Sequence, residues 1–224
     1  MSSSISFLSK DCLIKSLLVC GILSSALYVG MNILVAIQDT NYIATSQTVS
    51  ELSAIGAPTR SLWVYWSFAY TFLVVAFGWG IILSAEENRR MRSIGALIVF
   101  YGALGLGWPF VPMHTRDVLA AGGGTLSDTL HLVFSAVTVF FMLLALGFGA
   151  LTFGKAFRTY SIVTILVLAT FGMLTGIDSP NLAANMPTPL IGVWERINIG
   201  VFLLWVIVVA VILLRRRRLG EMIV

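Results

Sequence analysis

Residues Trp108–His131 read WPFVPMHTRDVLAAGGGTLSDTLH, a polar stretch between two long apolar segments. It contains both histidines of the chain, His114 and His131, with the carboxylates Asp117 and Asp128 between them. The apolar segments on either side are long enough to be membrane helices. The stretch is therefore expected to form the end of one membrane helix, a loop, and the start of the next helix.

The composition of the 224 residues excludes an ordinary soluble domain. Only 11% are charged and the mean hydropathy is +0.95, whereas roughly a quarter of the residues in a soluble domain are charged. The net charge of +4 does not indicate nucleic-acid binding, because the basic residues cluster at the ends of apolar segments. Cys12 and Cys20 both lie in the first apolar segment, so no disulfide framework is expected.

Six stretches are apolar over the ~20 residues that a spanning helix requires. They cover about Leu13–Ile37, Leu62–Ser84, Ser93–Met113, Leu130–Phe153, Tyr160–Ile177 and Val193–Leu214. The first is longer than the apolar core of a signal peptide, so we interpret it as a retained helix. The predicted fold is all-α: a single domain over residues 1–224, forming an integral membrane bundle of six transmembrane helices.

Lysine and arginine are distributed unequally between the two sides of such a bundle. With the N-terminus inside, three of the 14 basic residues (Arg60, Arg116 and Arg196) face outward and the other eleven face inward. An excess of this size in short loops marks the cytoplasmic side. Both termini are therefore predicted to be cytoplasmic, in the cell membrane. Arg215–Arg218 is interpreted as a topological stop, with binding of anionic lipid headgroups as the alternative.

The loop between the first two spans is expected to contain a short helix. Thr48 and Glu51 have the spacing of a capping box, in which two side chains satisfy each other's free backbone N–H groups. In that interpretation Glu51 is a structural cap. The alternative turns Ser50 or Ser53, together with Glu51, toward the mouth of the bundle.

Two prolines mark the end of the third span. Pro109 and Pro112 have no backbone N–H to donate, so the helix is predicted to kink or end there and to leave carbonyls free. Gly122–Gly124 then provide a flexible connection. Ser127 or Asp128 is the expected N-cap of the fourth helix.

Charged residues also stand at the head of the sixth span, where Glu195 and Arg196 begin the helix. Ionisable residues at membrane depth generally pair with one another or line a cavity. Arg196 is therefore expected to pair with Asp117, Asp128 or Glu51. The alternative is that Glu195 and Arg196 simply anchor the helix at the interface.

Two functions are compatible with these residues. The first is a membrane protein with an outward-facing polar pocket that binds a lipid headgroup, a small ligand or a partner, without a cofactor. The candidate pocket residues are Ser50, Glu51, Asp117, Asp128, His131, Glu195 and Arg196. A transporter is disfavoured because the inner half offers almost no ionisable residues for a path. The protein partner and the oligomeric state are left open.

The alternative is a membrane-embedded hydrolase that acts at the outer leaflet with zinc. Imidazole and carboxylate groups are normal zinc ligands, and bound zinc activates water for hydrolysis. The candidate ligands are His114, His131 and Asp128.

Several short motifs resemble one known family. They are SELSAIGAP before the second span, the proline-rich end of the third, Leu130-His131, and Trp194-Glu195-Arg196 before a helix that ends in arginines. Together they resemble the bacterial and archaeal membrane family catalogued as domain of unknown function 998. The resemblance covers about Leu13 to Arg218 and implies a six-helix membrane protein without an established activity. The positions that match its polar motifs are Ser50, Glu51, Asp117 or Asp128, His131, Glu195 and Arg196.

A looser similarity exists to membrane hydrolases of the ceramidase and adiponectin-receptor kind. Those enzymes combine a serine, an aspartate and three histidines around zinc. This chain has two histidines, and they do not follow that arrangement.

Overall fold

Helices account for most of the chain in the computed structural model, which describes residues 2–220, with side chains from Lys10 onward. The elements in order are α1 (Ser2–Ala36), the 3-10 helix η1 (Ser50–Ser53), α2 (Arg60–Ser84), α3 (Arg89–Leu104), the 3-10 helix η2 (Trp108–Phe110), α4 (Arg116–Ala120), α5 (Leu126–Ala150), α6 (Lys155–Ala183) and α7 (Ile191–Leu219). Within residues 2–220 no strand is present, and only an isolated bridge joins Ile55 to His114. The all-α prediction is confirmed.

Six helices of the described chain are long and apolar enough to cross a membrane. They correspond one to one to the six predicted spans, and the remaining helix, α4, has only five residues. The chain is therefore a multi-pass membrane protein by the length and composition of its helices.

Two helix ends differ from the prediction. One helix continues into polar residues, and another ends early, where a 3-10 turn takes its place. α6 runs on through Pro180 to Ala183, beyond the expected end at Ile177. The prediction stopped too early because the last residues of the helix are polar and hydropathy does not reveal them. Conversely, α3 ends at Leu104, before the prolines. Pro109 lies instead at the start of η2, where its missing N–H costs no helical hydrogen bond.

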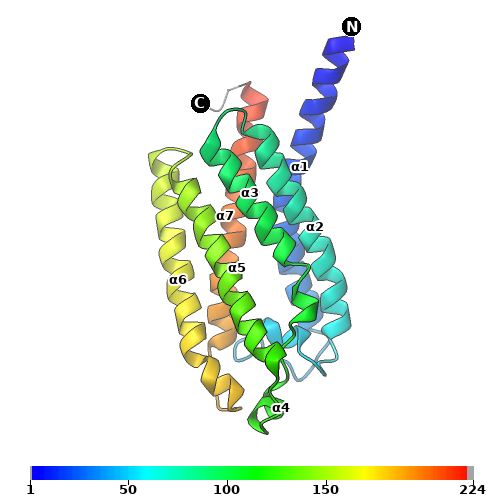
Figure 1. The fold of residues 1–224 in the computed structure, drawn as a ribbon, viewed down its shortest axis with the longest axis vertical. Coiled ribbons are helices and arrows are strands. Elements are labelled where there is room, and N and C mark those ends of the chain that lie inside the picture. The colour runs from blue at the N-terminus through cyan, green and yellow to red at the C-terminus, as the bar shows by residue number, and fades with distance from the viewer. Residues whose placement is uncertain (1, 221–224) are drawn as a thin grey trace.

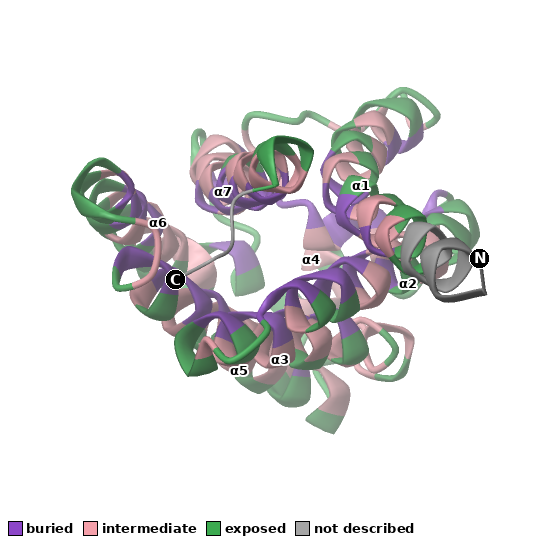
Figure 2. Cartoon of the chain, turned by 90° about the horizontal axis from the view of Figure 1, so that it is seen from above, coloured by how far each residue is buried: buried purple, intermediate pink, exposed green. Residues whose placement is uncertain are grey.

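The six long helices form a closed ring in chain order. α1 packs on α2, α2 on α3, α3 on α5, α5 on α6 and α6 on α7, and α7 packs on α1 to close the ring. Figure 2 shows the ring from above, along the helices, with the buried faces of the helices turned inward. Because consecutive helices are neighbours, short connections suffice, as is usual in up-and-down bundles.

The two ends of the ring have different loops. Both termini lie at one end, the terminal end, and α4 lies at the opposite one, the loop end, together with η1 and η2 (Figure 1). The eleven basic residues assigned to the inner side all lie in the parts of the helices and connections toward the terminal end, whereas Arg60, Arg116 and Arg196 lie at the loop end. The charge asymmetry of the sequence is thus an asymmetry between the ends of the structure.

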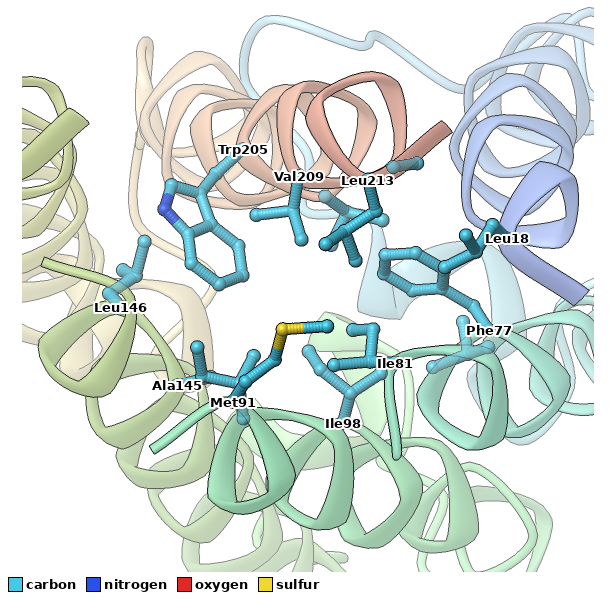
Figure 3. Packing of buried hydrophobic residues seen from close by; sticks show 14 of the residues in the cluster. Leu18, Phe77, Ile81, Met91, Ile98, Ala145, Leu146, Trp205, Val209 and Leu213 are labelled. Carbon is cyan, nitrogen blue, oxygen red and sulfur yellow. The ribbon is translucent and has the colours of Figure 1, made fainter. Parts of the chain in front are cut away.

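Apolar side chains fill the ring toward the terminal end. Leu18, Phe77, Ile98, Trp205 and Leu213 are fully buried and belong to one cluster that includes residues of all six long helices. Figure 3 shows these side chains converging from opposite sides of the ring. Since lipid provides no hydrophobic drive for helix association, this close packing is what holds the helices together.

Glycines permit the closest helix contacts within that core. A Cβ atom at Gly78 or Gly95 would lie 2.9 or 2.8 Å from the other's carbonyl oxygen, so α2 and α3 meet backbone to backbone. On α5, Gly149 lies directly against the Trp205 ring of α7. Glycines thus permit close packing both between α2 and α3 and between α5 and α7.

Candidate functional site

The first connection at the loop end, residues 37–59, folds around η1. Glu51 accepts hydrogen bonds from the Thr48 backbone N–H at 2.6 Å and from the Thr48 hydroxyl at 3.0 Å, and its own N–H donates to the Thr48 hydroxyl at 3.3 Å. These are the reciprocal bonds of a capping box. The structural interpretation of Glu51 is confirmed.

Glu51 also forms a buried ion pair that the sequence did not reveal. Arg116, at the start of α4, donates from Nε at 2.5 Å and from Nη2 at 2.9 Å to the two carboxylate oxygens. The same guanidinium donates to the Thr188 hydroxyl and to the Ser46 carbonyl. The Glu51 side chain is only 6% exposed, so Arg116 neutralises a carboxylate that is removed from water. The Arg116 side chain thereby joins the three connections of the loop end, which are those between α1 and α2, between α3 and α5, and between α6 and α7.

Arg196 holds the same loop from another side. Its donors bond to Asn32 of α1, to the Tyr42 hydroxyl, and to the carbonyls of Ala44, Gln47 and Gly192. The expectation that Arg196 pairs with Asp117, Asp128 or Glu51 is therefore wrong. Burial raises the pKa of Tyr42 to about 12, although the hydrogen bond from Arg196 opposes that shift, so this hydroxyl stays protonated.

Glu195 differs from Glu51 because it has no cationic partner. Its carboxylate accepts from the Val49 backbone N–H and, at 3.3 Å, from the Ser50 hydroxyl. Throughout the described chain, no lysine, arginine or histidine nitrogen lies within 4.0 Å of it. Although Arg196 is its neighbour in sequence, the guanidinium is directed to other acceptors.

Aromatic and aliphatic side chains pack around Val49, the backbone partner of Glu195. Val49, which bonds to the carboxylate, belongs to a buried cluster with Trp63, and Tyr28 packs against that cluster. Ile199 lies one helical turn beyond Glu195 on the same face of α7 and packs there too. The Tyr28 ring meets Trp63 edge-on, with 5.9 Å between ring centroids.

The aromatic contacts continue from this cluster toward the core. Tyr28 meets the Tyr70 ring with 5.1 Å between centroids, and the Tyr70 and Tyr101 hydroxyls are hydrogen-bonded at 2.8 Å. Both partners of that hydrogen bond are polar groups of the ring interior. The hydroxyl-bearing rings of Tyr70 and Tyr101 thus connect the cluster near Glu195 with the apolar core, against which both tyrosines pack.

His114 is bound at the start of α5. Asp128 accepts from the His114 backbone N–H at 2.7 Å and lies 2.9 Å from its Nδ1 atom. Asp128 also accepts from the Thr125 N–H, because Thr125 is the N-cap and Asp128 completes a capping box. The predicted N-cap, Ser127 or Asp128, is wrong by two to three residues: the cap has to lie where the glycine loop ends.

His131 has a different environment although it lies on the same helix. Its Nδ1 atom is 2.8 Å from the Val111 carbonyl, which can only accept, so Nδ1 carries the proton. The residue is 5% exposed and packs edge-on against Trp108. Its Nε2 atom is buried without a hydrogen-bond partner among the described residues.

Three carbonyls of the proline segment accept hydrogen bonds from side chains of other helices. Arg60 donates to Pro109, Ser127 to Pro112 at 2.6 Å, and His131 to Val111. The prediction of free carbonyls at this helix end is confirmed, and their partners are side chains of α2 and α5. Ser127 therefore docks the proline segment instead of capping the helix.

The residues postulated for zinc do not converge. Nowhere in residues 2–220 do three or more His, Cys, Asp or Glu side chains form a group that could hold a metal ion. His114 is committed to Asp128, and His131 points to a backbone carbonyl. Asp117 is exposed on α4, away from both. The donor set of the zinc alternative is therefore not assembled in this fold.

The candidate pocket residues do not form a single site. Glu51 lies in the ion pair with Arg116, Ser50 and Glu195 bond to each other, and Arg196 clamps the first connection. Asp128 and His131 belong to the α5 side and make no bond to these groups within the described residues. Sequence reasoning missed Arg116, Tyr28 and Tyr70. For Arg116, the available signal was that it is one of only three basic residues at the predicted outer side.

Comparison with known proteins identifies the family. No curated protein and no solved structure was found to match the sequence. A family model described as "Protein of unknown function (DUF998)" matches residues 22–212, which cover four of the six spans completely and most of the first and the last. The chain therefore belongs to this family of multi-pass membrane proteins, as its motifs predicted.

Proposed function

We propose that this protein is a non-enzymatic ligand-binding protein of the cell membrane, with its loop end outside and both termini in the cytoplasm. The orientation rests on the positive-inside rule, because basic residues concentrate at the terminal end. The binding region is the interior of the ring at the loop end, where Glu195 lies beneath the first connection. The ligand enters from the outside.

The contrast between the two halves of the ring supports binding over transport. A transport path needs polar groups through the middle of the membrane. Toward the terminal end the interior consists of closely packed side chains such as Phe77, Ile98 and Trp205, all at 0% exposure. The carboxylate of Glu195 and the hydroxyls of Tyr28 and Tyr70 lie toward the loop end, whereas buried polar groups toward the terminal end, such as Ser84 and Ser161, are short hydroxyl side chains.

One observation carries the proposal: Glu195 is a carboxylate inside the bundle for which the fold supplies no cation. The other interior carboxylate of this region, Glu51, has a bidentate arginine, so the fold does neutralise a buried charge where the charge is structural. A group that remains uncompensated at a membrane-embedded site is a functional candidate with a ligand as its partner. Glu195 and its neighbours Tyr28 and Tyr70 also keep part of their surface accessible.

Cysteine labelling in sealed vesicles tests both the orientation and the site. In a background with Cys12→Ala and Cys20→Ala, Ala121→Cys in the loop end and Glu87→Cys in the terminal end report orientation with a membrane-impermeant thiol reagent. Both positions are exposed, so each should react from one side only.

The site itself is probed at Ile199→Cys, one turn from Glu195, with Ile98→Cys in the sealed half as the matched control. We expect Ile199→Cys to react from the loop-end side and Ile98→Cys to react from neither side. An unreactive Ile199→Cys would show that the region does not admit solutes. Reaction of Ile98→Cys from the terminal side would indicate a continuous path and refute the non-transporting function.

A further inference from the structure

Resting on the proposed function, the geometry points to an alkylammonium group as the ligand of Glu195: we propose that this carboxylate, together with the Tyr28 and Trp63 rings of the cluster around its partner Val49, binds the cationic head of an amine or quaternary ammonium compound. The charge of the ligand follows from Glu195. Its two protein partners are a backbone N–H and a hydroxyl, which are neutral donors. A bound cation would supply the counter-charge that these neutral donors do not.

The nearby arginines do not provide that charge. Arg196 has all three guanidinium nitrogens bonded to oxygens of α1, the first connection and its own helix. Arg116 is occupied by Glu51, and Arg60 by the carbonyls of Ser53 and Pro109. Moving any of them to Glu195 would break the bonds that hold the loop end together. A diffusible cation neutralises Glu195 without that loss.

The aromatic neighbours select the kind of cation. Tyr28 contacts both Trp63 and Tyr70 in T-shaped geometry, and neither of these rings stacks parallel to it. The negative face of an aromatic ring attracts an ammonium group, and tryptophan and tyrosine are the strongest side chains for this purpose. A metal cation such as Na⁺ would instead require a set of converging oxygen ligands. Here the cluster around Val49, the partner of Glu195, supplies mainly carbon, from Trp63, Met31 and Ile199.

An alkylammonium group can come from two sources, a lipid headgroup or a soluble amine. Both present the same positive nitrogen with apolar substituents, which matches a carboxylate among aromatic and aliphatic side chains. The lipid source requires access from the outer leaflet, and the soluble source requires access from water. The site chemistry is common to both, so the experiment separates them by the form in which the ligand is offered.

The binding test uses the full chain in nanodiscs of phosphatidylglycerol, a lipid without an ammonium group. Tetramethylammonium, choline and ethanolamine are titrated against NaCl at equal ionic strength, with intrinsic tryptophan fluorescence and the thermal midpoint as readouts. Trp63 lies in the cluster beside Glu195, so occupancy should change its emission. We expect saturable binding of at least one ammonium compound that is at least tenfold tighter than any response to Na⁺. The lipid arm repeats the measurement in nanodiscs with phosphatidylethanolamine or phosphatidylcholine, where a lipid ligand should compete with the soluble compounds.

Variants connect the binding to the site. Glu195→Gln keeps the hydrogen-bond acceptor but removes the charge, and should weaken ammonium binding at least tenfold. Tyr28→Leu should weaken it while leaving Glu195 in place. Asp117→Asn, an exposed carboxylate at the same end, is the matched control and should bind as the unmodified chain does. Should Glu195→Gln fail to fold, Tyr28→Leu and Glu195→Asp supply the comparison, because the second retains the charge.

Two results would overturn the ligand class. One is a response to ammonium compounds no stronger than that to Na⁺, and the other is unchanged affinity in both Glu195→Gln and Tyr28→Leu. In either case, labelling of Ile199→Cys from the loop-end side would still support a binding region for another ligand. An unreactive Ile199→Cys together with absent ammonium binding would refute the proposed function itself.

Discussion

Removing Arg116 should open the loop end while leaving the helical ring intact. In Arg116→Met, Glu51 stays buried at 6% exposure but loses its only ionic partner in the described chain, and the Thr188 and Ser46 oxygens lose their guanidinium donor. Breaking a buried ion pair by removing one partner costs about 3–5 kcal/mol. We expect that cost to act on residues 37–59 and on α4, the segments that the arginine joins.

Hydrogen exchange of backbone amides measures this locally. A loss of about 3 kcal/mol corresponds to roughly a hundredfold faster exchange, at 1.4 kcal/mol per tenfold change. The most informative amides are Leu52, Ala54 and Ile55, the last of which donates to the Met113 carbonyl and thus reports the docking of one connection on another. Amides of the core helices, such as those around Ile98, should exchange at unchanged rates.

Two further variants make the argument quantitative. Arg89→Met removes an exposed arginine at the terminal end and should leave loop-end exchange unchanged. The double variant Glu51→Gln/Arg116→Met removes the unpaired charge. Its loop-end amides should therefore exchange faster than those of the unmodified chain by a smaller factor than the product of the factors for the two single variants. Two results would refute the conclusion that the buried ion pair stabilises the loop end. One is additive effects of the two substitutions, and the other is an Arg116→Met variant whose amides exchange like those of Arg89→Met.

Three more predictions follow from the loop end. Gly192→Ala should destabilise the docking of the first connection by about 1–3 kcal/mol, because the added Cβ would meet the carbonyl oxygens of residues 44 and 47; Gly200→Ala, with open space around it on the same helix, should cost much less in the same exchange measurement. Asp128→Asn should lower the free energy of unfolding by about 1 kcal/mol through the weakened capping box, and Asp117→Asn should not. Zinc or a chelator should leave the thermal midpoint unchanged, and a stoichiometric zinc content abolished by His131→Ala would revive the hydrolase hypothesis.

The fold was largely predictable because its signals are local. Six apolar stretches of sufficient length specify six helices, and the basic residues of their connections specify which ends lie together. The errors fall at helix ends, where hydropathy carries no information. α6 continues through Pro180 because the polar residues around it still form helical hydrogen bonds, and α3 ends before its prolines because a 3-10 turn takes over.

The candidate site was predictable only within short sequence distances. The Thr48–Glu51 capping box is a three-residue pattern, and it formed as expected. The ion pair of Glu51 with Arg116 spans 65 residues and depends on how the ring closes, so no local pattern indicates it. For the same reason Arg196 was assigned to a carboxylate, whereas backbone carbonyls of a folded loop offered it more acceptors.

Closure of the ring by α7 on α1 has a consequence for biosynthesis. Helices of a membrane protein are made in order, and α7 is the last of the six spans to leave the ribosome. Residues 37–59, made long before, cannot complete their hydrogen bonds until Glu195 and Arg196 arrive with that span. The loop that contains Glu51 first lacks Arg116 of α4, and after α4 has been made it still lacks Glu195 and Arg196 of α7. Assembly of the loop end therefore reports that the whole chain has been inserted, and a quality-control protease acting outside the membrane could distinguish truncated chains by their open first connection.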